Sequence, residues 1–304
     1  MLLPAALSTI FDSIVRRVHL PAMRLPSIFL IVVWLLHAAS AQAVENRFFT
    51  TSDGVKLHYL EAGPPNAETI VFVPGWTMPA WIWTRQIEAF STTRHVIAFD
   101  PRGQGASDIP RSGYDQNRRG RDLGELIDRL GPRPVLVVAW SLGVLDTLAY
   151  IHVSGDQRIA GLALVDNSIG EDPAPVAPPS DGSKPTPHDI FIRRFVPAMF
   201  HARQAAEWID RLIVACLRVP EAAARSLLAY PVPRTYWREA VYSTTKPILY
   251  VVRPRLAGQA ENLVKKHPSA ESVLFPTAGH ALFVDEPARF DAVVANFIQR
   301  KVWP

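Results

Sequence analysis

Two residues have the types and surroundings that nucleophilic chemistry needs, and the first is Ser141. It is the central residue of the stretch from Ala139 to Gly143, whose first residue ends the apolar run 135–139. A small-x-Ser-x-Gly sequence between a buried strand and a helix is the nucleophile elbow, a strained turn that exposes the serine hydroxyl above a sheet. The N-terminus of the following helix then lies beside the reaction centre. We therefore expect Ser141 to be a nucleophile.

His280 is the second such residue. It lies in the stretch from Ala278 to Ala281, just after the apolar strand that we predict near Phe275. Where a serine stands on a strand-to-helix turn of this kind, the histidine that accepts its proton follows late in the chain. We therefore expect His280 to be the general base of Ser141.

The elements that must position these residues alternate along the chain. Apolar runs predict strands at 69–73, 96–99, 135–139, 162–165, 248–252 and 272–275, and helical spacing predicts helices at 82–90, 118–130, from 142 and at 291–299. Asp53-Gly54 predicts a hairpin before them. The expected fold class is α/β, with a mostly parallel sheet and helices on both of its faces.

The alternation breaks between residues 169 and 245. A stretch rich in Pro, Ser and Gly (173–187) leads into four helical segments, and the strand pattern resumes only at residue 248. Helices inserted between two late strands predict a cap over the carboxyl ends of the strands, where open α/β sheets bind ligands. The chain thus divides into a core of 44–168 and 246–304 and a helical cap of 169–245.

The first 43 residues have the pattern of an export signal. The apolar run Ser27–His37 is preceded by Met23-Arg24 and followed by the small residues of Ala39–Ala43. The run is too short to span a bilayer comfortably, and its flanks are those of a secretory signal peptide. We expect a secreted or periplasmic protein, cleaved near Ala43 and without a stable membrane span. An uncleaved anchor is the alternative, and Met23 is an alternative start.

The composition argues against several classes of function. The 304 residues are 48 % hydrophobic and 20 % charged, as in globular proteins, and the net charge of +4 comes from scattered basic residues. A protein that binds nucleic acid would gather such residues on one element. No His/Cys ligand cluster and no dinucleotide-binding glycine pattern occurs, so we expect neither a metal nor an organic cofactor. The single cysteine, Cys216, lies in an apolar helical segment and is expected to be buried.

The chain resembles the α/β-hydrolase superfamily between about Phe48 and Ile298. The resemblance rests on Val73–Trp76, Asp100–Ser107, the turn at Ser141, and Gly279-His280 with Glu286-Pro287. The turn at Gly75-Trp76 is similar to that of carboxylesterases, where backbone amides hold the oxyanion. This similarity implies the same role for the amides of Trp76 and Leu142. Pro74 stands where the family usually has a histidine.

The acid of a Ser-His-acid triad is missing from its usual place. Members of the family usually carry an aspartate just after the strand that here is 248–252, but Leu256 stands at about that position. Asp166, which ends the preceding strand, is the first candidate. Neighbouring strand ends converge on one site, and some relatives, among them certain haloalkane dehalogenases, carry the acid there.

Other sources of an acid stay open. Glu261 lies in the right segment, although a helix there would turn it to solvent, and it is the second candidate. Glu171 and Asp172 lie at the entrance of the cap and would need a loop folded inward. A serine–histidine pair without any acid would keep partial activity.

These residues predict hydrolysis of a small-molecule carboxylic ester or a related acyl compound through an acyl-enzyme on Ser141. A serine at this position argues against dehalogenase and epoxide-hydrolase chemistry, both of which use an aspartate there. One alternative is a cofactor-free perhydrolase or acyltransferase, which would use the same residues with another acceptor. Another is a hydrolase-like protein that only binds a small hydrophobic ligand, which the displaced acid favours.

Overall fold

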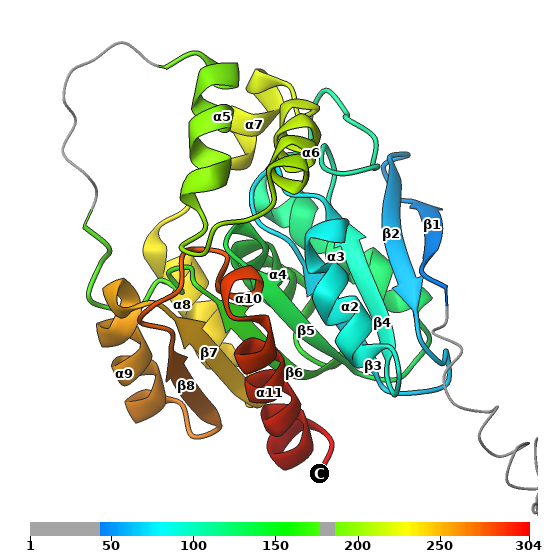
Figure 1. The fold of residues 1–304 in the computed structure, drawn as a ribbon. Coiled ribbons are helices and arrows are strands. Elements are labelled where there is room, and N and C mark those ends of the chain that lie inside the picture. Colours follow the sequence, from blue (N-terminus) through cyan, green and yellow to red (C-terminus); the bar gives the residue numbers. More distant parts are fainter. Residues whose placement is uncertain (1–42, 177–185) are drawn as a thin grey trace, which may run out of the picture. The chain divides into compact units, whose positions relative to one another are not determined.

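A computed structural model describes residues 43–176 and 186–304, and the predicted signal peptide, up to residue 42, lies outside them. Eight strands form one sheet in the order β1-β2-β4-β3-β5-β6-β7-β8 (Figure 1). Strands β3 to β8 run parallel to one another, whereas β2 is antiparallel to both of its neighbours. The prediction of a mostly parallel sheet is confirmed.

The strands follow the apolar runs of the sequence. They are β1 (Glu45–Thr50), β2 (Lys56–Ala62), β3 (Thr69–Val73), β4 (His95–Asp100), β5 (Val135–Trp140), β6 (Ile159–Val165), β7 (Ile248–Val252) and β8 (Ala270–Leu274). Every residue of β3, β4, β5 and β7 is buried. Strands covered on both faces are apolar throughout rather than alternating, which explains these continuous runs. The predicted hairpin joins β1 to β2, and Gly54 takes the positive φ of its turn.

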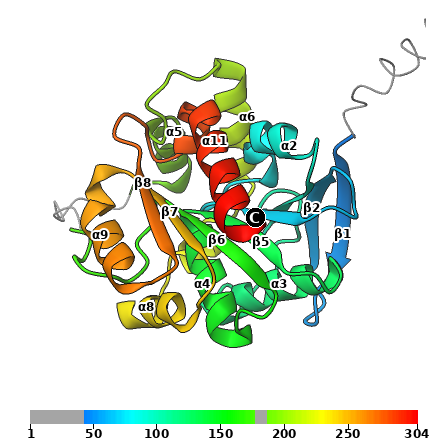
Figure 2. The ribbon, with the colours of Figure 1, turned by 90° about the horizontal axis from the view of Figure 1, so that it is seen from below.

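Helices cover both faces of the sheet. They are α2 (Thr84–Phe90), α3 (Gln116–Arg129), α4 (Leu142–Ser154), α5 (His188–Ala198), α6 (Ala206–Leu217), α7 (Glu221–Leu227), α8 (Arg234–Ser243), α9 (Ala257–Lys266), α10 (Leu282–Asp285) and α11 (Pro287–Phe297), with short turns η1 (Ala80–Trp83), η2 (Pro254–Leu256) and η3 (Ile298–Val302). Helices α3, α4 and α8 pack together on one face, and α2 and α11 lie together on the other (Figure 2). Among the described residues, no helix is both long and apolar enough to cross a membrane.

Helices α5 to α7 lie over the carboxyl ends of the strands, at the top of Figure 1. The indole N–H of Trp76, in the loop after β3, donates to the carbonyl of Ala224 in α7 at 2.8 Å. Arg218, which follows α6, donates to the carbonyl of Ser107, in the loop after β4, at 2.8 Å. Cys216 of α6 is fully buried, as predicted. These helices therefore rest on the loops that surround Ser141.

Helix α8 belongs to a different layer from α5, α6 and α7. It packs against α4 beside the sheet and buries Trp237, Ala240 and Val241. The predicted cap of 169–245 includes this segment, but the structure places it in the helix layer with α3 and α4. The part of the insertion that lies over the strand ends is therefore shorter than the sequence indicates.

Candidate active site

Ser141 stands on a sharp turn between β5 and α4. Its φ of 54° and ψ of −120° place it outside the regions that L-residues normally occupy. Its amide donates to the carbonyl of Val165 at 3.0 Å, and the Asn167 side chain donates to its carbonyl at 2.8 Å. A Cβ at Gly143 would lie 2.6 Å from the carbonyl oxygen of Val73, so only glycine allows α4 to start this close to β3. The small-x-Ser-x-Gly sequence thus meets a steric requirement of this turn.

His280 lies in the loop after β8, and hydrogen bonds to other segments hold this loop in place. The carboxylate of Asp285 accepts hydrogen bonds from the Gly279 amide at 2.7 Å and the His201 amide at 2.8 Å. The indole N–H of Trp140 donates to the carbonyl of His280 at 2.8 Å. A side chain at position 279 would overlap the backbone of the segment that follows α5, which explains the glycine before the histidine. The side chains of Asp285 and Trp140 therefore hold the backbone that carries the imidazole of His280.

The structure brings Ser141, His280 and Asp166 into one hydrogen-bonded chain. Nε2 of His280 lies 2.9 Å from Oγ of Ser141, and Nδ1 lies 2.7 Å from Oδ2 of Asp166. The Asp166 side chain is fully buried. Of the predicted acids, it is Asp166 that reaches the imidazole; Glu261 lies exposed on α9.

Glu171 is buried as well, but in a separate cluster. Its carboxylate accepts hydrogen bonds from the Tyr242 hydroxyl, the Lys266 ammonium and the Asp172 amide. Burial alone would raise its pKa, but these donors outweigh that effect and lower the pKa to about 2. Glu171 is thus an ionised carboxylate that ties the segment after β6 to α8 and α9, and Asp172, which is exposed, does not join the site.

Asp166 is held by the residues that follow β7. The pairing of β6 with β7 places Val165 opposite Val251, so the two strand ends meet. Asp166 takes a φ of 45°, a conformation that aspartate adopts more readily than most residues. The Arg253 amide donates to Oδ1 at 3.1 Å and Nε of Arg253 donates to Oδ2 at 2.7 Å, while a guanidinium nitrogen of Arg255 lies 3.7 Å from Oδ2. The segment after β7, where the sequence resemblance implied an aspartate, thus supplies two arginines that hold the aspartate of the neighbouring strand.

The surroundings lower the pKa of both Asp166 and His280. Burial favours the neutral form of Asp166, but the hydrogen bond to His280 and the nearby positive charges outweigh it and lower the pKa of the carboxyl. Burial, together with the charges of Arg253 and Arg255, lowers the pKa of His280 against the opposing effect of Asp166. At neutral pH the pair is therefore a carboxylate beside a neutral imidazole, whose Nε2 is able to accept the serine proton.

The two expected oxyanion donors lie on different segments beside Ser141: the Trp76 amide in the loop after β3 and the Leu142 amide at the start of α4. A Cβ at Gly75 would lie 3.0 Å from the Cβ of Ser141, so this loop passes directly next to the nucleophile. Within residues 43–176 and 186–304, neither the Trp76 amide nor the Leu142 amide donates a hydrogen bond to a protein acceptor. Both N–H groups are therefore available to an oxyanion that develops at this point.

Gln104 supports this loop, a role that the sequence alone does not reveal. Its side-chain oxygen accepts a hydrogen bond from the Thr77 amide at 2.5 Å, and its side-chain nitrogen donates to the carbonyls of Gly75 at 3.2 Å and Met78 at 3.4 Å. The glutamine lies within the Asp100–Ser107 motif, which is the one signal that points to it. These bonds fix the turn although a proline precedes Gly75.

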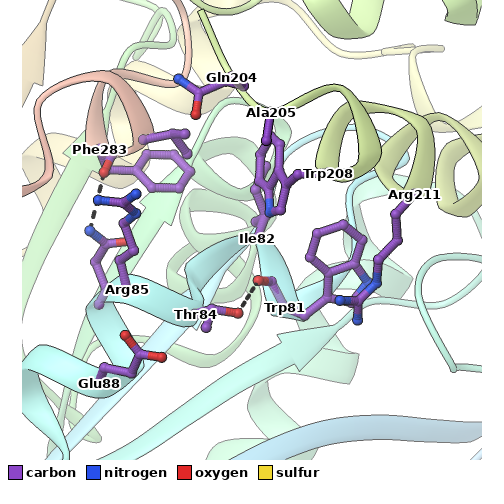
Figure 3. A pocket seen from close by; sticks show the side chains of 12 residues that line it. Trp81, Ile82, Thr84, Arg85, Glu88, Gln204, Ala205, Trp208, Arg211 and Phe283 are labelled. Atoms are coloured by element: carbon purple, nitrogen blue, oxygen red, sulfur yellow. Dashed lines mark hydrogen bonds between the residues drawn. The ribbon is translucent and has the colours of Figure 1, made fainter. Parts of the chain in front are cut away.

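A cavity of about 500 Å³ lies near the site, between α2 and α6 (Figure 3). Trp81 and Trp208 meet edge to face on its wall, and the guanidinium carbon of Arg211 lies 4.3 Å from the centre of the Trp81 ring. Its lining includes no member of the hydrogen-bonded chain, so it is distinct from the reaction centre. In the part of the chain that the structure describes, no cluster of three or more His, Cys, Asp or Glu side chains is arranged to hold a metal ion.

A sheet of this topology, with a serine on the turn after β5 and a histidine after β8, defines the α/β-hydrolase class of proteins. The profile of the Alpha/beta hydrolase family matches residues 70–293, and the chain belongs to this family. The fold of an esterase from Rhodococcus sp. ECU1013 is similar, with a TM-score of 0.70 and 21 % identity over 84 % of this chain and 99 % of that one.

Curated relatives match a smaller part of the chain. A non-heme chloroperoxidase of Streptomyces lividans is 34 % identical over 117 residues, which are 38 % of this chain and 42 % of the relative. A bifunctional esterase/perhydrolase of Acinetobacter calcoaceticus is 29 % identical over 119 residues, which are 39 % of this chain and 43 % of the relative. The matches thus span about two fifths of the length of these relatives.

Proposed function

We propose that the protein is an exported serine hydrolase that cleaves carboxylic esters of small molecules. The observation that carries the proposal is the continuous contact from Oγ of Ser141 through His280 to a buried carboxylate, at 2.9 Å and 2.7 Å. A serine is a weak nucleophile by itself, and an adjacent base that is oriented by a third group activates it. Export rests on the sequence pattern around Ser27–Ala43 alone.

The first half of the reaction forms an acyl-enzyme. Oγ of Ser141 attacks the ester carbonyl while Nε2 of His280 takes its proton, and the charge of Asp166 stabilises the imidazolium. The amides of Trp76 and Leu142 donate to the oxyanion, which is the largest single contribution to catalysis in such sites. His280 then gives the proton to the leaving alcohol as the carbon–oxygen bond breaks.

The second half returns the free enzyme. Water donates a proton to His280 and attacks the acyl carbonyl, and the oxyanion forms again at the same two amides. When the acyl–serine bond breaks, His280 returns the proton to Oγ of Ser141. The same imidazole therefore acts twice as base and twice as acid.

Perhydrolysis is a second candidate function, favoured by the similarity to the esterase/perhydrolase of Acinetobacter calcoaceticus. Hydrogen peroxide would replace water in the second half of the reaction. One of its oxygens would bond to the acyl carbon, and the proton of that oxygen would pass to His280. The products are a peracid and the free serine, so no redox cofactor is needed. A competition between peroxide and water as acceptors measures which reaction dominates.

The experiment that tests the proposal is hydrolysis of 4-nitrophenyl esters of increasing acyl length by the wild type and by Ser141→Ala. We expect the substitution to lower kcat by at least about 10⁴-fold, because it removes the nucleophile. A fluorophosphonate probe should label the wild type and leave Ser141→Ala unlabelled. If the wild type hydrolyses no ester faster than Ser141→Ala and resists the probe while folded, the chain is not a serine hydrolase.

Export has its own test. The N-terminal sequence of the protein recovered outside the cytoplasm of an expressing bacterium should begin at Val44, the residue after Ala43. Recovery of the full chain in the cytoplasm alone would contradict export without affecting the hydrolase proposal.

A further inference from the structure

A second cavity borders the imidazole of His280. It has a volume of about 370 Å³ and is lined by Phe195, Ala198, Met199, Arg253, Arg255 and His280. Side chains from α5 and its C-terminal end form an apolar wall, and the two arginines after β7 form a positively charged one. The cavity therefore combines apolar surface with cationic groups directly beside the base of the proposed reaction.

The arginines of this cavity outnumber their acidic partners. Within the described residues, Asp166 is the one acidic side chain in contact with Arg253 and Arg255, and His280 shares it. Arg253 makes a direct hydrogen bond to this carboxylate, whereas Arg255 approaches it only to 3.7 Å and is 49 % exposed. With His280 neutral, the wall carries one surplus positive charge. A guanidinium has five N–H donors, and Arg255, at 49 % exposed against 26 % for Arg253, offers more of them to solvent.

The position of the cavity indicates which part of an ester would occupy it. In the tetrahedral intermediate the oxyanion faces the amides of Trp76 and Leu142, whereas the leaving oxygen must face His280 to receive its proton. The alcohol part of the substrate therefore departs on the side of His280, where the cavity lies. Arginine binds carboxylates through two parallel N–H···O bonds, and half-exposed Arg255 is placed to do so.

We propose that the protein prefers esters whose alcohol part carries a negatively charged group such as a carboxylate, and that Arg255 binds this group. This inference rests on the proposed ester hydrolysis. The apolar wall of α5 would contact the body of the alcohol, and the anion would lie against the guanidinium. The arginines after β7 thus hold the acid of the site and also select the substrate.

The test compares 4-acetoxybenzoate, whose alcohol part is anionic, with its neutral methyl ester, each rate being divided by the alkaline hydrolysis rate of the same ester. We expect the wild type to prefer the anionic ester. Arg255→Gln should lower kcat/KM for the anionic ester about tenfold more than for the neutral one, which corresponds to about 1.4 kcal/mol. Added salt should raise the KM of the anionic ester alone.

Arg300→Gln is the matched control, because Arg300 is 48 % exposed and pairs with Glu271 near the start of β8, at the opposite end of the sheet. It should leave the preference as in the wild type. If Arg255→Gln lowers the rates of both esters equally, the arginine acts only through Asp166 and the inference is overturned. If the wild type cleaves 4-nitrophenyl esters but neither of these two esters, this inference alone is overturned. If it cleaves no ester and also resists the fluorophosphonate probe while folded, the proposed function fails, and this inference with it.

Discussion

Asp166 and Glu171 are both buried carboxylates that follow β6, and both have a lowered pKa. Glu171 contacts a tyrosine, a lysine and a backbone amide, which are groups that only stabilise its charge. Asp166 contacts an imidazole whose other nitrogen reaches a serine on a strained turn. Burial and a shifted pKa are therefore common to a structural and a functional carboxylate, and what distinguishes the two is the partner.

The ends of β6 and β7 extend this comparison. The sequence resemblance implied an acid after β7, yet that strand end supplies Arg253 and Arg255, and the acid comes from the neighbouring strand. Because the two strand ends meet in the sheet, a carboxylate on either one reaches the same imidazole. The position of the acid along the chain is thus less constrained than its position in space.

Arg253→Gln should have the largest effect among residues that do not belong to the hydrogen-bonded chain. It removes the Nε hydrogen bond to Asp166 and a cation that lies 3.5 Å from Nδ1 of His280. We expect kcat/KM to fall about 10- to 100-fold, within the range that supporting residues of a site contribute. Arg253→Lys, which keeps the charge, should lose less. Equal activity of Arg253→Gln and the wild type would show that the arginine does not position the acid.

The pH profile separates charge from geometry in this variant. His280 must be neutral to act as base, and its pKa is lowered. The kcat/KM of the wild type should therefore rise with pH, with an apparent pKa below 6.5, and level off above that pKa. Removing the cation of Arg253 favours the imidazolium, so the apparent pKa of Arg253→Gln should be higher. An unchanged or lower value, measured on the same ester, would contradict this electrostatic role.

Gln104→Ala tests the support of the oxyanion loop. The variant loses the hydrogen bonds to Thr77, Gly75 and Met78, so the Trp76 amide should move away from the oxyanion. We expect kcat to fall about tenfold, less than the 10²- to 10³-fold that follows complete loss of one donor, with little change in KM. A change confined to KM would show that the loop binds substrate without stabilising the oxyanion.

Glu171→Gln should have the smallest effect on activity and a clear effect on stability. We expect kcat/KM within about twofold of the wild type and a loss of about 1–3 kcal/mol in the free energy of unfolding at pH 7, typical of a lost charged hydrogen bond. The carboxylate stabilises the fold above its unfolded pKa of 4.5, and this contribution is lost as the pH falls toward about 2. Denaturant unfolding at several pH values should therefore show a steeper acid loss in the wild type.

The sequence predicts the sheet and the serine and histidine positions because these depend on local patterns. A continuous apolar strand, small residues around Ser141 and a glycine before His280 each reflect a requirement that the adjacent backbone imposes. Gln104 and the arginines after β7 have no such local pattern. Their roles depend on contacts between distant segments, such as Gln104 with Thr77 and Arg253 with Asp166, which only the folded chain defines. For the same reason, the sequence alone leaves Asp166 as one of several candidates for the acid of the triad.

The measurement that tests the central claim most directly is kcat/KM of Asp166→Asn beside Glu261→Gln on one 4-nitrophenyl ester, with the melting temperature of each variant as a control for folding. Asparagine keeps the shape of aspartate and removes the charge that orients and stabilises the His280 imidazolium. We predict a loss of about 10³- to 10⁴-fold for Asp166→Asn, and a value within about twofold of the wild type for Glu261→Gln. A folded Asp166→Asn that keeps more than about a tenth of the wild-type activity, or a loss of equal size in Glu261→Gln, would contradict the assignment of Asp166 as the acid.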